Sequence, residues 1–457
     1  WTISFPMVPF VLLQGSRRAF DLGGSPWTGV LVGALSVILL IISTALTVLF
    51  PAVELGPIHG EFNVGVVDLH LPVDFTEGVR RGSLLGTQHQ DSCDDPSGSY
   101  VSARLLYPTR QDPRDLPYLD PERADPKVVC SEFMKAGAPG PLKSFGWMLH
   151  NWRLITIRAR KNARPASDGG PFPLAIYSHG LIRNAAIYSY QALNLAANGM
   201  VVVMVDHTDE SAIAIRRRDS SHLLYDPSLI VNLSSNGNEE EYDRKRRAQT
   251  EHRAEECLSA LKVLRTLNRR NIPDLESVGV SFMDRLDVSD VTLIGHSFGG
   301  ATVLTAAARC SHSISAVVAH DPAVGWIPDW ARQKIFPPEE EGESGKEVEE
   351  GDCLTERVIH NANMLCLYCE EWADKGWGHY KQVKRMHKAH ADGTVSFEVG
   401  VIRKAHHSEF SDTCMITPLW LARATGLTGE RNPHETAEEI ACRTIEFLES
   451  NRRSKRT

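Results

Sequence analysis

The chain has 457 residues, of which 42% are hydrophobic and 23% charged. It is long enough to bury a sizeable core, and its length favours one large catalytic domain with appendages over several small domains. The formal net charge of −8 excludes an overall basic surface. We therefore expect no nucleic-acid partner.

The first predicted element is a long apolar stretch at residues 28–50. It has no charged residue, and its polar positions are essentially Ser36, Ser43, Thr44 and Thr47. The stretch is long enough to cross a bilayer as a helix, and it is longer than the apolar part of a cleavable signal peptide. We expect a transmembrane signal anchor here, with a buried core helix as the alternative.

Charge around this stretch predicts its orientation. Arg17 and Arg18 precede it, and the next basic residue is Arg80, so the N-terminal end is expected to stay cytoplasmic. The catalytic part would then face the lumen or the exterior, unless cleavage releases it. Because the first residue is Trp rather than Met, we expect the true start to lie upstream. The expected organisation is a cytoplasmic segment (1–27), the anchor (28–50), a linker (51–61) and the catalytic domain (62–452).

Short apolar runs recur along the catalytic domain and predict strands. Residues 62–71 and 100–107 form the first two, the second with alternating hydrophobicity. The later runs are continuously apolar, which is typical of strands covered on both faces of a parallel sheet. These later runs lie at residues 172–177, 200–205, 291–294, 314–319, 364–369 and 399–402.

Helical segments are predicted between these strands, at residues 187–198, 247–269 and 300–309, and a final helix runs from Pro433 to about residue 452. Strands that alternate with helices indicate an α/β fold with a mostly parallel central sheet flanked by helices.

Two segments do not fit this alternation. Residues 336–352 are strongly acidic and predict a solvated insertion, with a regulatory or partner-binding segment as the alternative. Residues 145–161 combine apolar bulk with positive charge, which suits a helix on a lipid surface. An ordinary core-facing helix with a basic outer face fits equally well. The candidate membrane contacts are Trp147, Met148, Leu149, Trp152, Leu154 and Ile155.

The nine cysteines are scattered and form no dense framework. Cys366 and Cys369 are three residues apart on a predicted strand, so their side chains point to opposite faces. A zinc site would need a second ligand pair at suitable spacing, and none stands out. We expect no metal and no other cofactor.

The strongest chemical signal is Gly295-His296-Ser297-Phe298-Gly299, between a predicted strand and a helix of small residues. A turn this tight needs glycines beside the serine, and it holds the hydroxyl clear of the sheet at a helix N-terminus. Ser297 is therefore the predicted nucleophile for acyl transfer.

Acyl transfer by a serine also needs a base and an acid that orients the base. In the strand-turn-helix arrangement the acid and then the histidine follow the serine along the chain. Asp321 ends a predicted strand and is the leading acid, with Asp329 as the fallback. His406 and His407 follow the last strand, and spacing alone does not choose between them.

The negative oxygen formed in acyl transfer needs two backbone N–H donors. One is expected from Phe298, directly after the nucleophile. The other is expected from the loop after an earlier strand. Ser178-His179-Gly180-Leu181 fits that position, with the N–H of Leu181 as the donor.

With these motifs in place, the chain resembles the platelet-activating factor acetylhydrolase family, plasma or type II group, over most of residues 62–450. The segment HSEFSD, which begins at His407, resembles the family's H-x-x-F-x-D motif, and this resemblance selects His407 over His406. Asp321 falls at the place of the family's acid. The segments that carry the resemblance are 105–108 (LLYP), 177–181 (YSHGL), 205–212 (VDHTDESA), 295–302 (GHSFGGAT) and 407–412 (HSEFSD).

This resemblance implies an α/β-hydrolase fold and a calcium-independent serine esterase. Such an enzyme removes the short or oxidised sn-2 acyl chain of phospholipids, such as 1-alkyl-2-acetylglycerophosphocholine, at a membrane or lipoprotein surface. It also favours a lipid-surface role for residues 147–155. Two alternatives remain open: an esterase or lipase acting on small esters or polyesters, and an inactive hydrolase fold that only binds.

Overall fold

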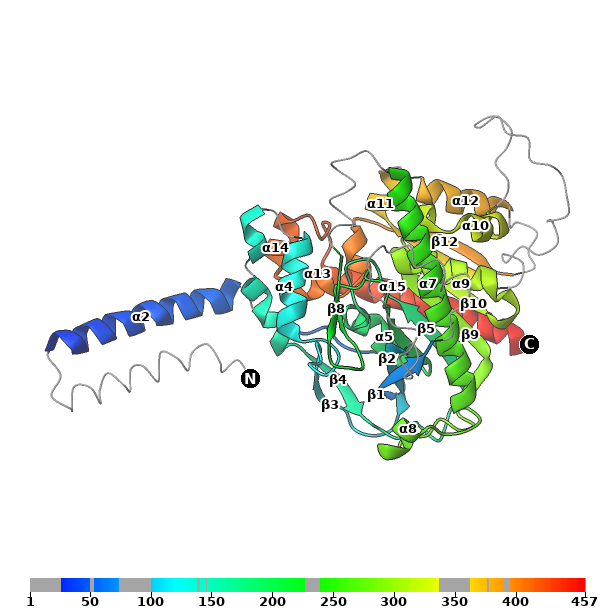
Figure 1. Ribbon diagram of the computed structural model, residues 1–457, viewed down its shortest axis with the longest axis horizontal. Coiled ribbons are helices and arrows are strands. Elements are labelled where there is room, and N and C mark those ends of the chain that lie inside the picture. Colours follow the sequence, from blue (N-terminus) through cyan, green and yellow to red (C-terminus); the bar gives the residue numbers. More distant parts are fainter. Residues whose placement is uncertain are drawn as a thin grey trace.

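The computed structural model describes residues 26–49, 53–73, 100–137, 140–144, 146–226, 239–336, 362–375, 378–389 and 395–456 (Figure 1). These residues form a ten-stranded sheet with the order β12-β11-β10-β9-β5-β6-β2-β1-β4-β3, and a small β7–β8 ribbon. The strands are β1 (Asn63–Pro72), β2 (Tyr100–Thr109), β3 (Arg114–Pro117), β4 (Thr156–Lys161), β5 (Phe172–Ser178), β6 (Val201–Asp206), β7 (Ala214–Arg216), β8 (His222–Leu224), β9 (Leu286–His296), β10 (Ala316–His320), β11 (Asn363–Cys369) and β12 (Phe397–Ile402).

Six strands that lie side by side in the sheet run parallel to one another: β6, β5, β9, β10, β11 and β12. Two strands of the sheet oppose this direction: β2 pairs antiparallel with both β6 and β1, and β3 at the far edge pairs antiparallel with β4. The predicted α/β fold with a mostly parallel central sheet is therefore confirmed. The carboxyl ends of β5, β9, β10 and β11 meet at one edge, where ligands of open α/β sheets gather.

Helices cover both faces of the sheet. They are α2 (Pro26–Leu49), α4 (Pro126–Gly137), α5 (Ser189–Ala197), α7 (Glu239–Leu267), α8 (Pro273–Ser277), α9 (Phe298–Arg309), α10 (Asp329–Ile335), α11 (Glu370–Asp374), α12 (His379–Ala389), α13 (Thr413–Ile416), α14 (Leu419–Ala424) and α15 (Pro433–Arg456). Short 3-10 helices are η1 (Gly140–Ser144), η2 (Gly146–Leu154), η3 (Ala185–Tyr188), η4 (Ser311–Ser313), η5 (Val324–Trp326) and η7 (His407–Phe410).

The continuous apolar run of β6 explains this two-sided cover. Because successive side chains of a strand point to opposite faces, Val201, Val203 and Val205 pack in the core cluster that includes α7 and α9. Val202 and Met204 pack in the other cluster, with α5 and α15. A strand with water on one face would need polar residues at every second position.

Residues 145–161 differ from the predicted single helix. The chain forms the 3-10 helix η2 and then strand β4, which extends the sheet beyond β1 and pairs with β3. The alternation of apolar and charged residues in TIRARK matches a strand with one buried face, which its burial pattern shows. At residues 156–161 the alternation of buried and exposed side chains is therefore that of a strand, and the prediction of an amphipathic helix is wrong there.

The predicted transmembrane anchor at residues 28–50 is wrong. The chain does form a helix there, α2, which Figure 1 shows extending away from the sheet. Among the helices in the described part of the chain, however, none combines the length and apolarity needed to cross a membrane. The same finding overturns the predicted single-pass membrane location with a lumenal or extracellular catalytic domain.

The predicted linker at residues 51–61 is described from residue 53 onward, and it packs against the domain. Leu55 is buried in the α5–α15 cluster, and His59 N–H donates to Asn194 Oδ1 at 3.1 Å. A Cβ at Gly60 would lie 2.4 Å from the carbonyl of Ala197, so this chain segment runs directly against the end of α5. The acidic segment at residues 336–352 lies outside the described residues except for Phe336.

Candidate active site

Ser297 stands in a tight turn between β9 and α9. Its φ of 56° lies in the left-handed region, which is rare for a residue other than glycine. A Cβ at Gly295 would lie 2.2 Å from the carbonyl oxygen of Gly299, so the turn closes only because position 295 carries no side chain. Strained backbone of this kind is common at functional sites.

The structure brings Ser297 and His407 together from positions 110 residues apart. The Ser297 Oγ lies 2.9 Å from His407 Nε2, and His407 Nδ1 lies 2.9 Å from Asp321 Oδ2. With the Nδ1 proton donated to the carboxylate, Nε2 is left to accept the proton of the serine hydroxyl. Asp321 is fully buried, Ser297 is 8% exposed and the side chain of His407 is 22% exposed, so the relay lies just beneath the surface.

Asp321 follows β10 directly, beside the strand that carries the serine. Its N–H donates to the carbonyl of Leu367 at 2.7 Å, and its Oδ1 accepts the N–H of Cys369 at 2.8 Å. The carboxylate is therefore held by β11 on one oxygen and presents the other oxygen to His407. The fallback acid, Asp329, lies at the start of α10 and forms an ion pair with Arg247 at 3.2 Å instead.

Two aromatic rings pack against the ring of His407. The indole of Trp372 stacks on it with a centroid distance of 3.8 Å and an interplanar angle of 1°. The ring of His296 lies 4.5 Å away, and the backbone N–H of His407 donates to Glu371 at 3.1 Å. His406 instead places its Nδ1 3.1 Å from the carbonyl oxygen of Gly426, so the structure brings His407 to Ser297, and not His406.

The two expected oxyanion donors lie on segments that touch each other. A Cβ at Gly299 would lie 2.0 Å from the carbonyl oxygen of Ser178, so the turn that leads to Leu181 packs directly against the start of α9. Among the described residues, the N–H groups of Leu181 and Phe298 have no backbone acceptor. Both are free to bind a substrate oxygen, and their role as donors stays a prediction.

Three of the six candidate membrane contacts are buried: Leu149, Trp152 and Ile155. Trp152 packs edge-on against the ring of Phe133, with 5.0 Å between centroids, so these three side chains belong to the core. Leu154 is 39% exposed and remains available to a lipid surface. The side chains of Trp147 and Met148 lie outside the described part of the structure.

In the described part of the chain, the potential metal ligands that cluster together are His296, Asp321 and His407, with ligand atoms within 4.8 Å of one another. Both ring nitrogens of His407 already bind Ser297 and Asp321. The hydrogen-bonded relay therefore accounts for this cluster, and the expected lack of a metal stays a prediction.

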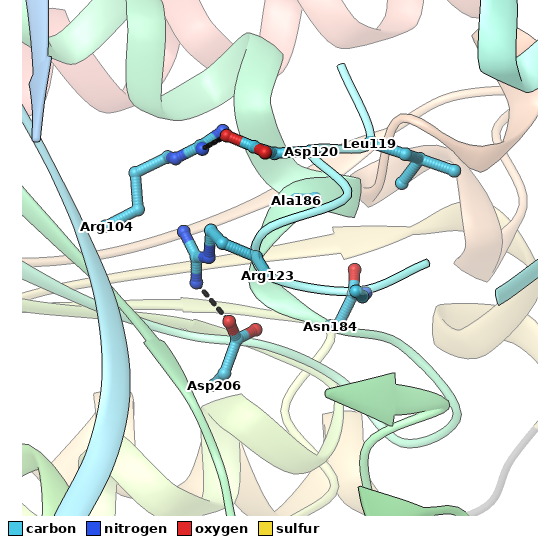
Figure 2. A pocket seen from close by; sticks show the side chains of 8 residues that line it. Arg104, Leu119, Asp120, Arg123, Asn184, Ala186 and Asp206 are labelled. Carbon is cyan, nitrogen blue, oxygen red and sulfur yellow. Dashed lines mark hydrogen bonds and ion pairs between the residues drawn. The ribbon is translucent and has the colours of Figure 1, made fainter. Parts of the chain in front are cut away.

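A small cavity lies behind the loop that follows Leu181 (Figure 2). Figure 2 shows Arg123 pointing to Asp206, and Asn184 entering from this loop. The cavity holds only about 10 Å³, which is the room of about one water-sized sphere. It cannot hold an acyl chain. Asp206 Oδ1 accepts the N–H of Ala185 at 2.7 Å, so this buried cluster anchors the loop.

Buried histidines predict how stability depends on pH. Burial lowers the pKa of His320 to about 3 and holds those of His179 and His296 well below their usual value. Below about pH 6.5 the unfolded chain binds protons at these positions and the folded chain does not, so stability is present above that pH and falls as pH is lowered.

We expect the free energy of unfolding to fall between neutral pH and about pH 5, by up to ~1.4 kcal/mol per pH unit for each such histidine. Urea denaturation should show a shallower fall in His320→Phe than in the unmutated chain. Asp412 acts in the opposite direction, because burial raises its pKa to about 7, and the comparison cancels its contribution. Equal slopes in the two proteins would contradict the prediction.

Comparison with known proteins decides the family. The model of the family described as platelet-activating factor acetylhydrolase, isoform II, matches residues 51–326, which is more than half of the chain. The chain belongs to the platelet-activating factor acetylhydrolase isoform II family. The resemblance that the sequence motifs indicate is thereby confirmed.

Individual members of this family match over shorter stretches. Platelet-activating factor acetylhydrolase of Cavia porcellus is 36% identical over 154 residues, which cover 33% of this chain and 35% of that protein. The Bos taurus protein is 34% identical over 156 residues, with the same shares. These matches span about a third of the relatives' length. A solved ferulic acid esterase from Streptomyces cinnamoneus is 17% identical, with a TM-score of 0.51 over 87% of this chain and 93% of that one, and shows the shared fold alone.

The family match ends at residue 326. It therefore includes Ser297 and Asp321 but not His407, whose assignment rests on the motif and on the geometry described above. Sequence reasoning did not single out Trp372, which stacks on His407. It also missed two residues of α7: Arg253, which binds His179 of the Ser178–Leu181 turn, and Glu256, which binds His207 and Thr208. No local pattern marks them, because their partners lie far away in the chain.

Proposed function

We propose that this acetylhydrolase-family chain is a calcium-independent serine esterase that hydrolyses the short or oxidised sn-2 acyl chain of phospholipids. The observation that carries the proposal is the continuous relay from Asp321 through His407 to Ser297, with 2.9 Å at each hydrogen bond. A serine hydroxyl aligned in this way becomes nucleophilic, because the imidazole takes its proton as the new bond forms.

In the proposed reaction, Ser297 Oγ attacks the ester carbonyl while His407 Nε2 accepts its proton. The backbone N–H groups of Leu181 and Phe298 stabilise the negative oxygen. The intermediate expels the lysophospholipid alkoxide, which takes the proton from His407 and leaves the acyl group on Ser297. A water molecule deprotonated by His407 then releases the carboxylic acid and restores the hydroxyl.

Trp372 supports the proton transfer in this scheme. Its indole face covers the ring of His407 at 3.8 Å, and an aromatic face attracts a cation. The imidazolium that forms during attack is therefore favoured, and the ring keeps its plane in the relay. Asp321 provides the matching negative charge on the other nitrogen.

Exposed apolar residues near the site support a lipid substrate. Leu419 and Trp420, on α14, are 42% and 47% exposed. They follow α13, which packs against η7, the short helix that begins with His407. Large apolar side chains exposed together favour a lipid or protein contact. This placement would bring the relay to the surface of a membrane or lipoprotein particle.

The proposal predicts a strong dependence on the sn-2 acyl chain. We expect kcat/KM for phosphatidylcholines to fall by about 100-fold or more from a short or oxidised chain to a long saturated one. Each methylene that the acyl pocket cannot accommodate raises the free energy of the transition state. The measurement is a series from acetyl to palmitoyl in mixed micelles. Activity should be unchanged with a calcium chelator, since imidazole and not a metal-bound water activates the attacking oxygen.

Two results would redirect the proposal. Turnover of p-nitrophenyl acetate without hydrolysis of any phospholipid would favour the esterase of small esters. Loss of all activity with the chelator, restored by calcium, would contradict the mechanism itself.

A further inference from the structure

Arg253 is a fully buried cation in the middle of α7. Its nearest carboxylate belongs to Asp209, with 3.7 Å between Nε and Oδ2. Taking a guanidinium out of water is unfavourable unless its N–H groups form hydrogen bonds with acceptors in the protein. The remaining contacts of Arg253 therefore indicate what the side chain does.

Those contacts join two separate segments of the site. Nη2 donates to the carbonyl oxygen of His179 at 2.6 Å, and Nη1 donates to Thr302 Oγ1 at 3.3 Å. The plane of the guanidinium also lies over the ring of Phe298, at 4.5 Å from its centroid. One side chain thus touches the Ser178–Leu181 turn and the first turn of α9 at the same time.

Each segment carries one of the proposed oxyanion donors. His179 lies two residues before Leu181, so its carbonyl fixes the peptide units that lead to the Leu181 N–H. Thr302 Oγ1 in turn donates to the carbonyl of Phe298 at 2.9 Å. Because the two donors must converge on one oxygen, their spacing depends on how these segments are held relative to each other.

A second tie comes from the next turn of the same helix. Ser178 Oγ lies 2.8 Å from His207 Nε2, and His207 Nδ1 lies 2.6 Å from Glu256 Oε2. The chemical order of this relay matches that of the catalytic one, but its three residues are entirely buried, so no ester can reach Ser178. It fixes the start of the turn, while Arg253 fixes its middle.

We propose that Arg253 is a positioning residue that sets the spacing of the Leu181 and Phe298 N–H groups by binding His179 and Thr302 together. The inference rests on the proposed function, since it concerns the same reaction. Without the guanidinium, the turn before Leu181 keeps its backbone packing against α9 but loses this side-chain link, and the oxyanion loses part of its stabilisation.

The test is Arg253→Met in the full chain, assayed on a short-chain ester. We expect kcat to fall about 10- to 100-fold with KM within about threefold, because the lost interaction acts mainly in the transition state. Affinity for a trifluoromethyl ketone, which forms an oxyanion on the serine, should fall by a similar factor. Arg253→Lys should recover part of kcat, since an ammonium reaches one of the two acceptors.

Two further variants keep the test decisive. Arg309→Met is the matched control: Arg309, at the far end of α9, also joins α7 to α9 through Glu255 and lies over the ring of Trp330. It should leave kcat unchanged. If Arg253→Met does not fold, Arg253→Met with Asp209→Asn removes the carboxylate left unpaired and should fold with the same low kcat.

The inference is overturned if kcat and ketone affinity survive in a folded Arg253 variant, or if Arg309→Met lowers them equally. An unmutated chain without Ser297-dependent esterase activity would overturn the proposed function as well. The two failures are therefore distinguishable.

Discussion

Replacing Ser297 by alanine should lower kcat for the preferred ester by about 10⁴- to 10⁶-fold while leaving the fold intact. Alanine cannot form the acyl-enzyme, and the residual rate would come from binding and from the oxyanion donors alone. Since the hydroxyl lies in a turn whose shape depends on Gly295 and Gly299, losing it should not disturb the backbone. Steady-state hydrolysis of a short-chain phospholipid measures the effect.

A serine at the opposite end of β10 from the relay provides the control. Ser315 lies just before β10, and its Oγ donates to the carbonyl of Ser289, away from the relay. Ser315→Ala should therefore hydrolyse the substrate at the normal rate. Substantial activity in Ser297→Ala would mean that another group attacks the ester.

The second large effect concerns adjacent histidines. We expect His407→Ala to lower kcat by about 10⁴- to 10⁶-fold, because no base remains to take the serine proton. His406→Ala should stay within about threefold of the normal rate, since its ring binds the carbonyl of Gly426 instead of the relay. The pair is a matched comparison, because both positions lie on the same loop.

The comparison should include urea denaturation of both variants, so that a loss of folding is not taken for a loss of chemistry. The reverse pattern, an active His407→Ala and an inactive His406→Ala, would move the base by one position. It would also require the loop to rearrange, since His406 does not contact Ser297 in the structure.

Much of the central fold was predictable because its strands are short, apolar on both faces and separated by amphipathic helices. The run at residues 200–205 and strand β6 (Val201–Asp206) differ by a single position at each end. Residues 145–161 were misjudged as one helix, since a partly charged strand with one exposed face and a surface helix both mix apolar with basic residues. Strand pairing with β1 and β3, which is not visible locally, decides between them.

Within the candidate site, the serine was the easiest residue to predict, because the glycines around it are required by the turn. The histidine was ambiguous from spacing, since His406 and His407 differ by one position and only the three-dimensional path of the loop separates them. Trp372 and Arg253 carry no local signal at all. Arg253 binds a carbonyl 74 positions away, a separation at which one sequence gives no information about contact.

The prediction of a transmembrane anchor shows the limit of judging a segment by its lack of charge. Residues 28–50 contain no ionised side chain, yet in the described part of the chain no helix reaches the length and apolarity of a membrane span. The proposed lipid contact therefore depends on exposed apolar residues of the domain such as Leu154 and Leu419, and not on a membrane span.

The most direct test of the central claim is to treat the protein with a fluorophosphonate and locate the adduct by peptide mass spectrometry. If an imidazole-activated serine performs the reaction, the adduct should form on Ser297, in step with the loss of esterase activity, and should fail to form at a measurable rate in His407→Ala. Inhibition with the adduct on a different residue, or unimpaired labelling of Ser297 without His407, would contradict the account.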